Sequence, residues 1–152
     1  MKSDIIIRAY TANDKNAMLG ILQANTPQYF SPEEEMDLIN YFENEIEYYF
    51  VAEIASKVIG GGGVNFNEDK TIAKISWDIL HPNYQDKGIG TQLINYRINM
   101  LKNFQNIKKI TVRTSQFANK FYEKRGFKLI SITKDFWAKG YDLFYMEVQA
   151  VN

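Results

Sequence analysis

Apolar residues recur along this chain with two different periods, which divide it into strands and helices. Alternating or continuous apolar runs predict seven strands, at residues 5–7, 48–54, 58–66, 72–80, 109–113, 128–133 and 143–148. Apolar spacing near 3.6 residues predicts four helices, which lie between Thr11 and Pro27, from Ser31 through Ile46, from Thr91 to about Asn103, and from about Phe117 to Lys124. The order of these elements predicts an α/β (α+β) fold, in which helices pack on a mixed and mostly antiparallel sheet.

Polar residues mark the ends of several predicted elements. Thr11 with Asp14 three residues later resembles a capping box, and residues 31–34 combine a serine cap, a proline and two acids, as helix starts do. The short polar connections at 55–57 and 67–70 predict that three successive strands form an antiparallel meander.

Four consecutive glycines, Gly60–Gly63, lie inside the second strand of this meander. Glycine weakens a strand unless the backbone bulges there or another group approaches it closely. We therefore expect a bulge or tight packing at this run, and a groove that faces a substrate is the alternative. No chemistry is assigned to these glycines from the sequence.

The composition fits one globular domain spanning residues 1–152, because 45% of the residues are hydrophobic and no linker or repeat interrupts the chain. Lysine plus arginine equals aspartate plus glutamate at 18 each, so no net charge favours nucleic acid or a membrane surface. The chain has no cysteine and one histidine, His81, so we expect neither disulfides nor a metal site. Residues 1–4 do not resemble a signal peptide and no apolar run reaches about 18 residues, which predicts a soluble, cytoplasmic protein.

A glycine-containing turn at residues 82–91 joins the 72–80 strand to the following helix. The first turn of a helix has unpaired N–H groups and a partial positive charge, so this junction is a candidate anion site. A Walker-type loop has its lysine after the glycines, whereas Lys87 precedes Gly88 and Gly90, and a dinucleotide turn needs a glycine where Leu93 stands. The turn alone does not identify the phosphate compound, and a plain helix start is the alternative.

Two segments taken together resemble a known family. Gln85-x-x-Gly88-x-Gly90 follows a strand, and Ala-Asn-Lys-Phe-Tyr-Glu-Lys-Arg-Gly-Phe at residues 118–127 comes about 30 residues later. This pairing resembles the GNAT superfamily of acyl-CoA-dependent N-acetyltransferases, with its pyrophosphate loop and its Phe-Tyr-Glu-Lys-x-Gly-Phe segment. The order of elements across nearly the whole chain is also similar, so the resemblance implies a GNAT-like fold of about seven strands and about four helices.

The resemblance implies how acetyl-CoA would bind as the acyl donor. Backbone N–H groups of the loop would hold the coenzyme A pyrophosphate, and these residues are Gln85, Asp86, Lys87, Gly88, Ile89, Gly90 and Thr91. Ile79 and Leu80 match the end of the strand whose main chain pairs with the pantetheine arm and polarises the thioester carbonyl. Asn119 would contact the pantetheine or the adenosine part. The chain departs from the family at Ser115, where many members have an asparagine seven residues before the tyrosine.

The resemblance also implies a catalytic role for Tyr122, which matches the family's proton donor to the departing thiolate. A donor is useful there because the thiolate must be protonated or otherwise stabilised as it leaves. Packing on the apolar side of its helix is the alternative role for Tyr122.

Asp78 is the candidate general base, because an ammonium of pKa about 10 must lose a proton before it attacks the thioester. Regular alternation along the strand places Asp78 on one face with Lys74, Ser76 and Leu80, from which it would reach an amine directly or through water. A structural ion pair is the alternative role for Asp78. His81 as the base, or a water chain with no dedicated base, is also left open.

The acceptor is not defined by these motifs. In the family the acceptor usually enters between the first two helices and the loop joining the last two strands. In this chain these parts are residues 28–30, 33–35 and 134–142. Their aromatic and acidic side chains suit a cationic amine. The expected function is acetyl transfer from acetyl-CoA to a primary amine of a small molecule or protein, directly in a ternary complex. A non-catalytic acyl-CoA-binding sensor or interaction module is the alternative, and a homodimer is left open.

Overall fold

Seven strands form one sheet in the order β1-β2-β3-β4-β5-β7-β6 in the computed structural model, which describes residues 4–150. The strands are β1 (Ile5–Ala9), β2 (Tyr48–Ile54), β3 (Lys57–Phe66), β4 (Ile72–Leu80), β5 (Lys109–Thr114), β6 (Lys128–Ala138) and β7 (Tyr141–Gln149). The helices are α1 (Lys15–Ala24), α2 (Glu34–Asn40), α3 (Ile89–Leu101) and α4 (Asn119–Glu123), with helical turns η1 (Ala12–Asp14), η2 (Tyr41–Glu45) and η3 (Pro82–Tyr84). No helix within residues 4–150 is long and apolar enough to cross a membrane. Residues 1–3 and 151–152, which include the two ends of the predicted domain and most of the segment compared with a signal peptide, lie outside the described residues.

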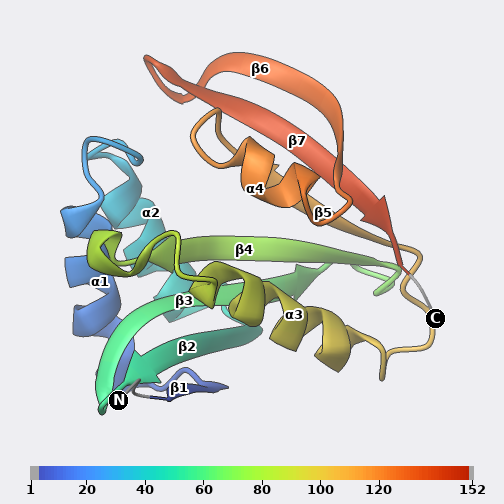
Figure 1. The fold of residues 1–152 in the computed structure, drawn as a ribbon. Helices are drawn as coiled ribbons and strands as arrows, with labels where there is room; N and C mark the ends of the chain where they lie inside the picture. The colour runs from blue at the N-terminus through green and yellow to red at the C-terminus, as the bar shows by residue number, and fades with distance from the viewer. Residues whose placement is uncertain (1–3, 151–152) are drawn as a thin grey trace.

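One neighbouring pair of strands is parallel, and it divides the sheet. β4 and β5 pair over Ile72–Ile75 and Lys109–Val112 only, whereas all the other neighbouring strands are antiparallel. Beyond this short ladder β4 continues to Leu80 and β5 to Thr114 without pairing with each other. Figure 1 shows β5, β7 and β6 leaning away from β4 there. The predicted element order and the mixed, mostly antiparallel sheet are confirmed.

Helices cover both faces of this sheet. Val51 of β2 is buried in a core with Met18 of α1, whereas its neighbour Ala52 is buried with Leu93 of α3. Successive residues of a strand point to opposite faces, so α1 and α2 lie on one face and α3 on the other. Tyr122 of α4 belongs to a core that also contains residues of α3, which places α4 on the α3 face.

The last hairpin differs from the prediction. The sequence predicts a loop at residues 134–142, but β6 and β7 extend through most of this segment and leave Lys139 and Gly140 as the turn. Gly140 has a φ of 85°, a conformation that favours glycine. The longer β6 is held by the Trp137 indole, which donates to the Thr114 carbonyl at 3.2 Å. Sequence patterns missed this because β6 is an edge strand whose side chains are almost all exposed.

The second helix also begins later than predicted. α2 starts at Glu34, whose carboxylate accepts a hydrogen bond from the Ser31 N–H at 2.8 Å. The Ser31 hydroxyl is buried without a hydrogen-bond partner, so Ser31 does not cap the helix through its side chain. The glutamate carboxylate, and not the serine hydroxyl, therefore makes the side-chain hydrogen bond between Ser31 and this helix start.

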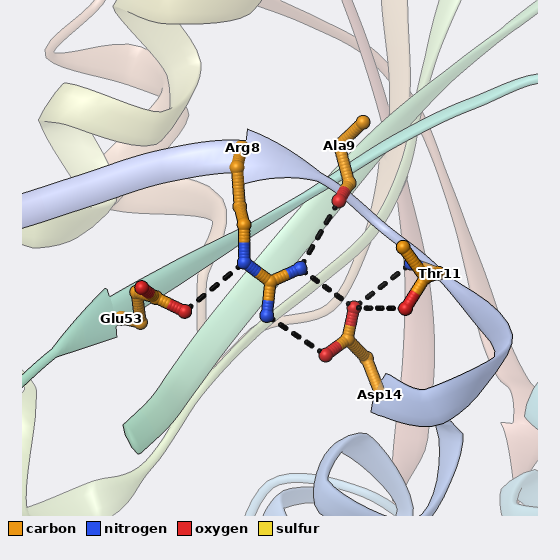
Figure 2. A network of polar contacts seen from close by, with 5 residues as sticks. All are labelled: Arg8, Ala9, Thr11, Asp14 and Glu53. Atoms are coloured by element: carbon orange, nitrogen blue, oxygen red, sulfur yellow. Dashed lines mark hydrogen bonds and ion pairs between the residues drawn. The ribbon is translucent and has the colours of Figure 1, made fainter. Parts of the chain in front are cut away.

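Arg8 of β1 ties the first strand to the first helical turn (Figure 2). Its guanidinium donates to both carboxylate oxygens of Asp14 at 2.9 Å and to Glu53 of β2 at 3.0 Å. Asp14 also accepts from the Thr11 N–H at 2.8 Å, as in the predicted capping box. The Arg8 hydrogen bond is the main reason that the pKa of Asp14 lies below its ordinary value, although burial acts in the opposite direction.

Replacing the carboxylate in this network should weaken the fold in a pH-dependent way. We expect Asp14→Asn to lower the free energy of unfolding by about 1–2 kcal/mol near neutral pH, an estimate discounted because Arg8 is partly exposed. Folding lowers the pKa of Asp14, so its contribution is present above the unfolded pKa of about 3.9 and is lost as the pH falls through the lower folded pKa.

Urea unfolding of both proteins near neutral pH and at about pH 3 measures this effect. Glu43→Gln is the matched control, since it breaks the exposed Lys15–Glu43 pair and should change stability by less than about 0.5 kcal/mol. A stability difference for Asp14→Asn that does not shrink in acid would contradict the assignment.

Candidate active site

A bulge interrupts β4 next to the glycines of β3. The register between the two strands shifts there, and Trp77 has a φ of 49°, which is unusual for a residue other than glycine. The Trp77 ring lies 6.4 Å from that of Tyr41 on the α2 face. The preceding Ser76 points to the same face, because its hydroxyl donates to Asn65 at 2.7 Å and Asn65 accepts from Tyr41. Two successive side chains of β4 thus share one face.

This bulge corrects the predicted orientation of Asp78. Regular alternation groups Asp78 with Lys74 and Ser76. The bulge adds one residue to β4, so the side chains after it point to the face opposite to the one that regular alternation predicts. Asp78 instead contacts Tyr122 on the α3 face, where Leu80 also packs. The grouping with Lys74 and Ser76 was wrong, and the grouping with Leu80 is confirmed.

Asp78, Tyr122 and Arg97 form a cluster on the α3 face of the bulge. The Tyr122 hydroxyl donates to Asp78 Oδ2 at 2.5 Å, and Arg97 Nη2 lies 2.6 Å from Asp78 Oδ1. The contact with Arg97 is an ion pair that lacks the geometry of a hydrogen bond. Arg97 is 1% exposed and Tyr122 is 4% exposed, whereas the Asp78 side chain is 22% exposed. Both predicted catalytic residues thus lie in hydrogen-bond contact with each other.

Arg97 was missed by the sequence analysis. It lies on the buried side of α3, four residues after Leu93 and four before Leu101, which are both buried. A charged residue in the middle of an apolar helical stripe is a signal for a buried ion pair, because an unpaired charge there would be too costly.

Gly62 of β3 makes room for this cluster. A Cβ atom at this position would lie 2.7 Å from Arg97 Cζ and closer still to Asp78 Oδ1, so neither side chain would fit beside it. The register shift and this close packing confirm the structural interpretation of the glycine run. Gly62 also links the run to the candidate site, which the sequence did not indicate.

The surroundings of Tyr122 keep its hydroxyl protonated. Burial is the largest effect and raises the pKa of Tyr122 well above its ordinary value, and the charge of Asp78 and its hydrogen bond raise it further. Arg97 and Arg125 act in the opposite direction without cancelling these effects. Tyr122 is therefore a hydrogen-bond donor at neutral pH.

The end of β4 has a free main-chain edge toward the gap. His81 N–H donates to Ile59 of β3 at 2.8 Å, so by the alternation of an antiparallel ladder the main chain of Ile79 also faces β3 and that of Leu80 faces away. The Leu80 carbonyl accepts from the side chains of Asn25 at 3.1 Å and Gln85 at 3.2 Å. Of the two residues predicted to meet the pantetheine arm, Leu80 has its N–H directed into the gap.

The loop before α3 has the geometry of an anion site. The first hydrogen bond of the helix runs from Gln92 N–H to the Gly88 carbonyl, so the N–H groups of Ile89, Gly90 and Thr91 have no partner within the helix. Gly88 has a φ of 82°, and a Cβ built there would have no atom within 4 Å. Gly88, Gly90 and Thr91 also line the groove, so open space lies beside these N–H groups, as phosphate binding requires.

The other predicted members of the loop differ in what they can offer. The Ile89 side chain is buried in the core, the ammonium of Lys87 lies 5.7 Å from the Tyr84 ring centre, and Asp86 places an exposed carboxylate at the groove. A Cβ at Gly90 would lie 3.1 Å from the Phe121 ring, so this glycine serves close packing with α4. Main-chain N–H groups rather than side chains make this loop a candidate phosphate site.

Arg125 lies beside this loop and was not singled out from the sequence. Its guanidinium stacks on the Phe121 ring at 3.7 Å, donates to the Phe121 carbonyl at 2.7 Å and contacts the Thr91 hydroxyl. Its Nε atom is buried without a hydrogen-bond partner. Arg125 comes just after α4, within the segment that resembled the family. Its place in that segment was the signal that could have indicated a contact with the loop before α3.

Three other residues named from the sequence have local structural roles. Asn119 is the first residue of α4 and, unlike its neighbours Ala118 and Lys120, it does not line the groove. The Ser115 hydroxyl accepts from the Phe117 N–H at 3.2 Å within the turn before α4. His81 Nδ1 accepts from the Asn83 N–H at 3.1 Å at the start of η3.

The gap between β4 and β5 is part of a groove of about 1260 Å³ that reaches both faces of the sheet. On the α3 face it is lined by Tyr122, Arg125 and the loop before α3. On the α2 face it is lined by aromatic and acidic side chains, namely Tyr29, Phe30, Tyr41, Trp77, Glu34, Glu45 and Glu47. Burial raises the pKa of Glu34 above its ordinary value. We call these two parts the loop side and the aromatic side of the groove.

Three aromatic rings in contact with one another line the aromatic side. Tyr29 and Tyr141 each have their ring centres 6.0 Å from that of Phe117. The Tyr141 hydroxyl also donates to the Pro27 carbonyl. We call Tyr29, Phe117 and Tyr141 the aromatic bridge, since they join the α1–α2 connection to β7 and all three line the groove. Within residues 4–150, no group of three His, Asp or Glu side chains is placed to hold a metal ion.

Comparison with known proteins identifies a family. The model of the acetyltransferase (GNAT) family matches residues 16–127. An N-alpha-acetyltransferase of Sulfurisphaera tokodaii is 27% identical in an alignment 139 positions long that covers 82% of this chain and 78% of that protein.

Solved structures share the fold. The ribosomal-protein-S18-alanine N-acetyltransferase from Escherichia coli superposes with a TM-score of 0.80 at 18% identity, covering 98% of this chain and 96% of that chain. An aminoglycoside 6'-N-acetyltransferase solved with coenzyme A has a TM-score of 0.78 at 15% identity, covering 97% of this chain and 98% of that chain.

Proposed function

Because this chain belongs to the GNAT family of acetyltransferases, and is therefore an acetyl-CoA-dependent acyltransferase, we propose that it acetylates the α-amine at the end of a polypeptide chain. The family and the fold establish acetyl transfer, and the groove supports the assignment of its two sides. The loop side would take the acyl donor, and the aromatic side would take the acceptor amine.

The loop side fits the donor in both shape and charge. The free N–H groups at the start of α3 and the open space at Gly88 suit a pyrophosphate. Arg125 adds a positive charge beside Thr91, which favours phosphate groups further. The free N–H of Leu80 suits the thioester carbonyl, where one such donor typically contributes about 3 kcal/mol to transition-state stabilisation.

The residues present support direct transfer. The amine nitrogen attacks the thioester carbonyl carbon, the new C–N bond forms, and the C–S bond breaks with its electron pair on sulfur. The ammonium gives one proton to water before the attack, the nitrogen gives a second proton to water once the C–N bond has formed, and the thiolate takes a proton from solvent after it leaves. Tyr122 stabilises the thiolate by donating a hydrogen bond, because full transfer from a phenol with a raised pKa to a thiolate of pKa about 8.5 is unfavourable.

The aromatic side favours a slender cationic acceptor. We infer that the three rings of the aromatic bridge narrow the groove that they line, and Glu45 and Glu47 add negative charge to its lining. An amine at the end of an extended chain passes such a restriction more easily than one on a bulky ring system. The relative from Sulfurisphaera tokodaii, whose name specifies the α-amine, gives independent support for this acceptor class.

A panel of amines tests this acceptor. Coenzyme A release can be followed with a thiol-reactive dye without background, because the protein has no cysteine. We expect turnover with lysine-free peptides that have a free N-terminus. We expect less than about a tenth of that rate with the same peptides acetylated at the N-terminus and carrying an internal lysine, with spermidine and with an aminoglycoside. Faster turnover with any of these three would reject the proposed acceptor and leave acetyl transfer itself intact.

Several expectations from the sequence remain predictions. A cytoplasmic location, a single domain over residues 1–152 and the absence of a metal requirement are consistent with the proposed reaction, which needs no covalent enzyme intermediate and no Lewis acid. Purified enzyme treated with a chelator should retain its turnover number.

A further inference from the structure

Arg97 is a charged residue in a place where a charge is costly. Its side chain is 1% exposed, and its guanidinium donates to the Leu93 carbonyl and to the Gly63 carbonyl, both at 3.1 Å. Its third nitrogen, Nη2, lies 2.6 Å from Asp78 Oδ1. Replacing a buried ion pair with apolar residues is often neutral or stabilising, so a buried pair is weak evidence for a role in stability. Besides conformational specificity, a role in the chemistry of the site is a reason for keeping such a pair.

The position of the pair indicates what that role is. Asp78 forms an ion pair with Arg97 through one carboxylate oxygen and accepts a hydrogen bond from Tyr122 through the other, so the three side chains form a chain from the core to the groove. Gly62 leaves the space that this arrangement needs. Asp78 and Arg97 together carry no net charge, so the cluster fixes the tyrosine without leaving an uncompensated carboxylate beside a thiolate that is forming.

We propose that Asp78 and Arg97 are positioning residues that act through Tyr122: Arg97 neutralises Asp78, and Asp78 holds the Tyr122 hydroxyl as a hydrogen-bond donor at the gap between β4 and β5. This inference rests on the proposed function, in which Tyr122 stabilises the departing thiolate. As negative charge develops on sulfur, the hydroxyl exchanges one anionic acceptor for another. Arg97 makes that exchange easier because it weakens Asp78 as a competing acceptor.

This role differs from that of a general base, which the sequence suggested for Asp78. Both carboxylate oxygens are already engaged, and Asp78 lies on the loop side rather than on the aromatic side with Ser76 and Trp77. A base has to take a proton from the amine, and the two carboxylate oxygens already face the Tyr122 hydroxyl and Arg97 Nη2. The two roles predict different pH profiles.

Four variants separate the two roles: Asp78→Asn, Arg97→Met, the double variant, and Glu147→Gln as the matched control. The control also converts a carboxylate to an amide and breaks an ion pair, that of Lys109 with Glu147, but this pair does not line the groove. For each, kcat, the KM for acetyl-CoA and the dependence of kcat on pH are measured with the best amine of the panel.

A positioning role predicts the following pattern. Asp78→Asn lowers kcat by about 3- to 10-fold, keeps the KM for acetyl-CoA within about 2-fold, and retains the rise of activity with pH that comes from the amine itself. Arg97→Met leaves Asp78 uncompensated and lowers kcat by more than about 10-fold. The double variant removes that charge and recovers to the level of Asp78→Asn, which is non-additive behaviour.

Three results would overturn the proposal. The first is a loss of more than about 100-fold in Asp78→Asn together with loss of the rise with pH, which would make Asp78 the base. The second is additivity of the two single substitutions. The third is a kcat of Arg97→Met equal to that of Glu147→Gln. Should Arg97→Met fail to fold, Asp78→Asn and the double variant still decide, because positioning predicts equal kcat values for them.

A spectroscopic measurement tests the cluster without any acceptor. The groups whose charges act on Tyr122 are Asp78 on β4, Arg97 on α3 and Arg125 just after α4. Titration of ¹³C-labelled tyrosine, with Tyr122 assigned by its loss in Tyr122→Phe, should show its pKa falling in Asp78→Asn and unchanged in Glu147→Gln. An unchanged pKa in Asp78→Asn would contradict the inference. A wild-type enzyme inactive on all peptides would instead contradict the proposed acceptor, so the two failures are distinguishable.

Discussion

Replacing Gly88 with valine should abolish acetyl-CoA binding at concentrations that saturate the wild-type enzyme. A Cβ at this position has no atom within 4 Å in the free protein, so the valine would occupy the open space in front of the N–H groups at the start of α3. That space is where the pyrophosphate is expected, and a branched side chain there excludes it. Isothermal titration should show the Kd for acetyl-CoA rising by at least about 100-fold, or about 2.7 kcal/mol.

Gly140→Val is the matched control for this variant. Gly140 has a φ of 85°, close to the 82° of Gly88, and it also has no atom within 4 Å of a built Cβ. Both substitutions therefore impose similar backbone strain, but Gly140 lies in the turn between β6 and β7, away from the loop. We expect its Kd to stay within about 2-fold of wild type. Near wild-type affinity in Gly88→Val would mean that the phosphate site lies elsewhere.

Removing one oxygen from Tyr122 should reduce turnover with little effect on donor binding. Tyr122→Phe loses the hydrogen bond to the departing thiolate, so we expect kcat to fall by about 10- to 100-fold while the Kd for acetyl-CoA stays nearly constant. The same change leaves Asp78 Oδ2 without its partner, which should lower the free energy of unfolding by about 1–3 kcal/mol. Steady-state kinetics and urea unfolding measure the two effects separately.

Tyr48→Phe is the control for the loss of a tyrosine hydroxyl. Tyr48 is 40% exposed and packs against Phe66 and Phe104, and it does not line the groove. Its kcat should equal that of the wild type. A kcat of Tyr122→Phe that matches the wild type across the pH range would remove Tyr122 from the mechanism and leave it a packing residue.

Local patterns in the sequence were enough to predict the order of elements and the general type of sheet. The meander of β2, β3 and β4 followed from short connections and apolar alternation, because both signals are contained in a few adjacent residues. The last hairpin was predicted less well, since β6 is an exposed edge strand with little apolar alternation to mark its end.

The candidate site was predicted in its parts but not in its arrangement. Asp78 and Tyr122 were identified separately, but their contact joins residues 44 positions apart, and no local pattern reports such a distance. The face of Asp78 was predicted wrongly because a bulge changes the phase of a strand without changing its residue types. Arg97 and Arg125 were missed because each acts through a partner on another element.

Because the ladder between β4 and β5 is short, we expect the stability of the fold to depend on whether the donor is bound between these strands. The two strands pair across this seam over residues 72–75 and 109–112, preceded by one hydrogen bond from Lys108 N–H to the Thr71 carbonyl, and the proposed donor site occupies the place where further rungs would be. A ligand that binds only the folded state stabilises it in proportion to the logarithm of its concentration over Kd. The folded enzyme should therefore be most stable with its donor bound and less stable after each product release, so that the supply of acetyl-CoA sets how much of the population resists unfolding and proteolysis.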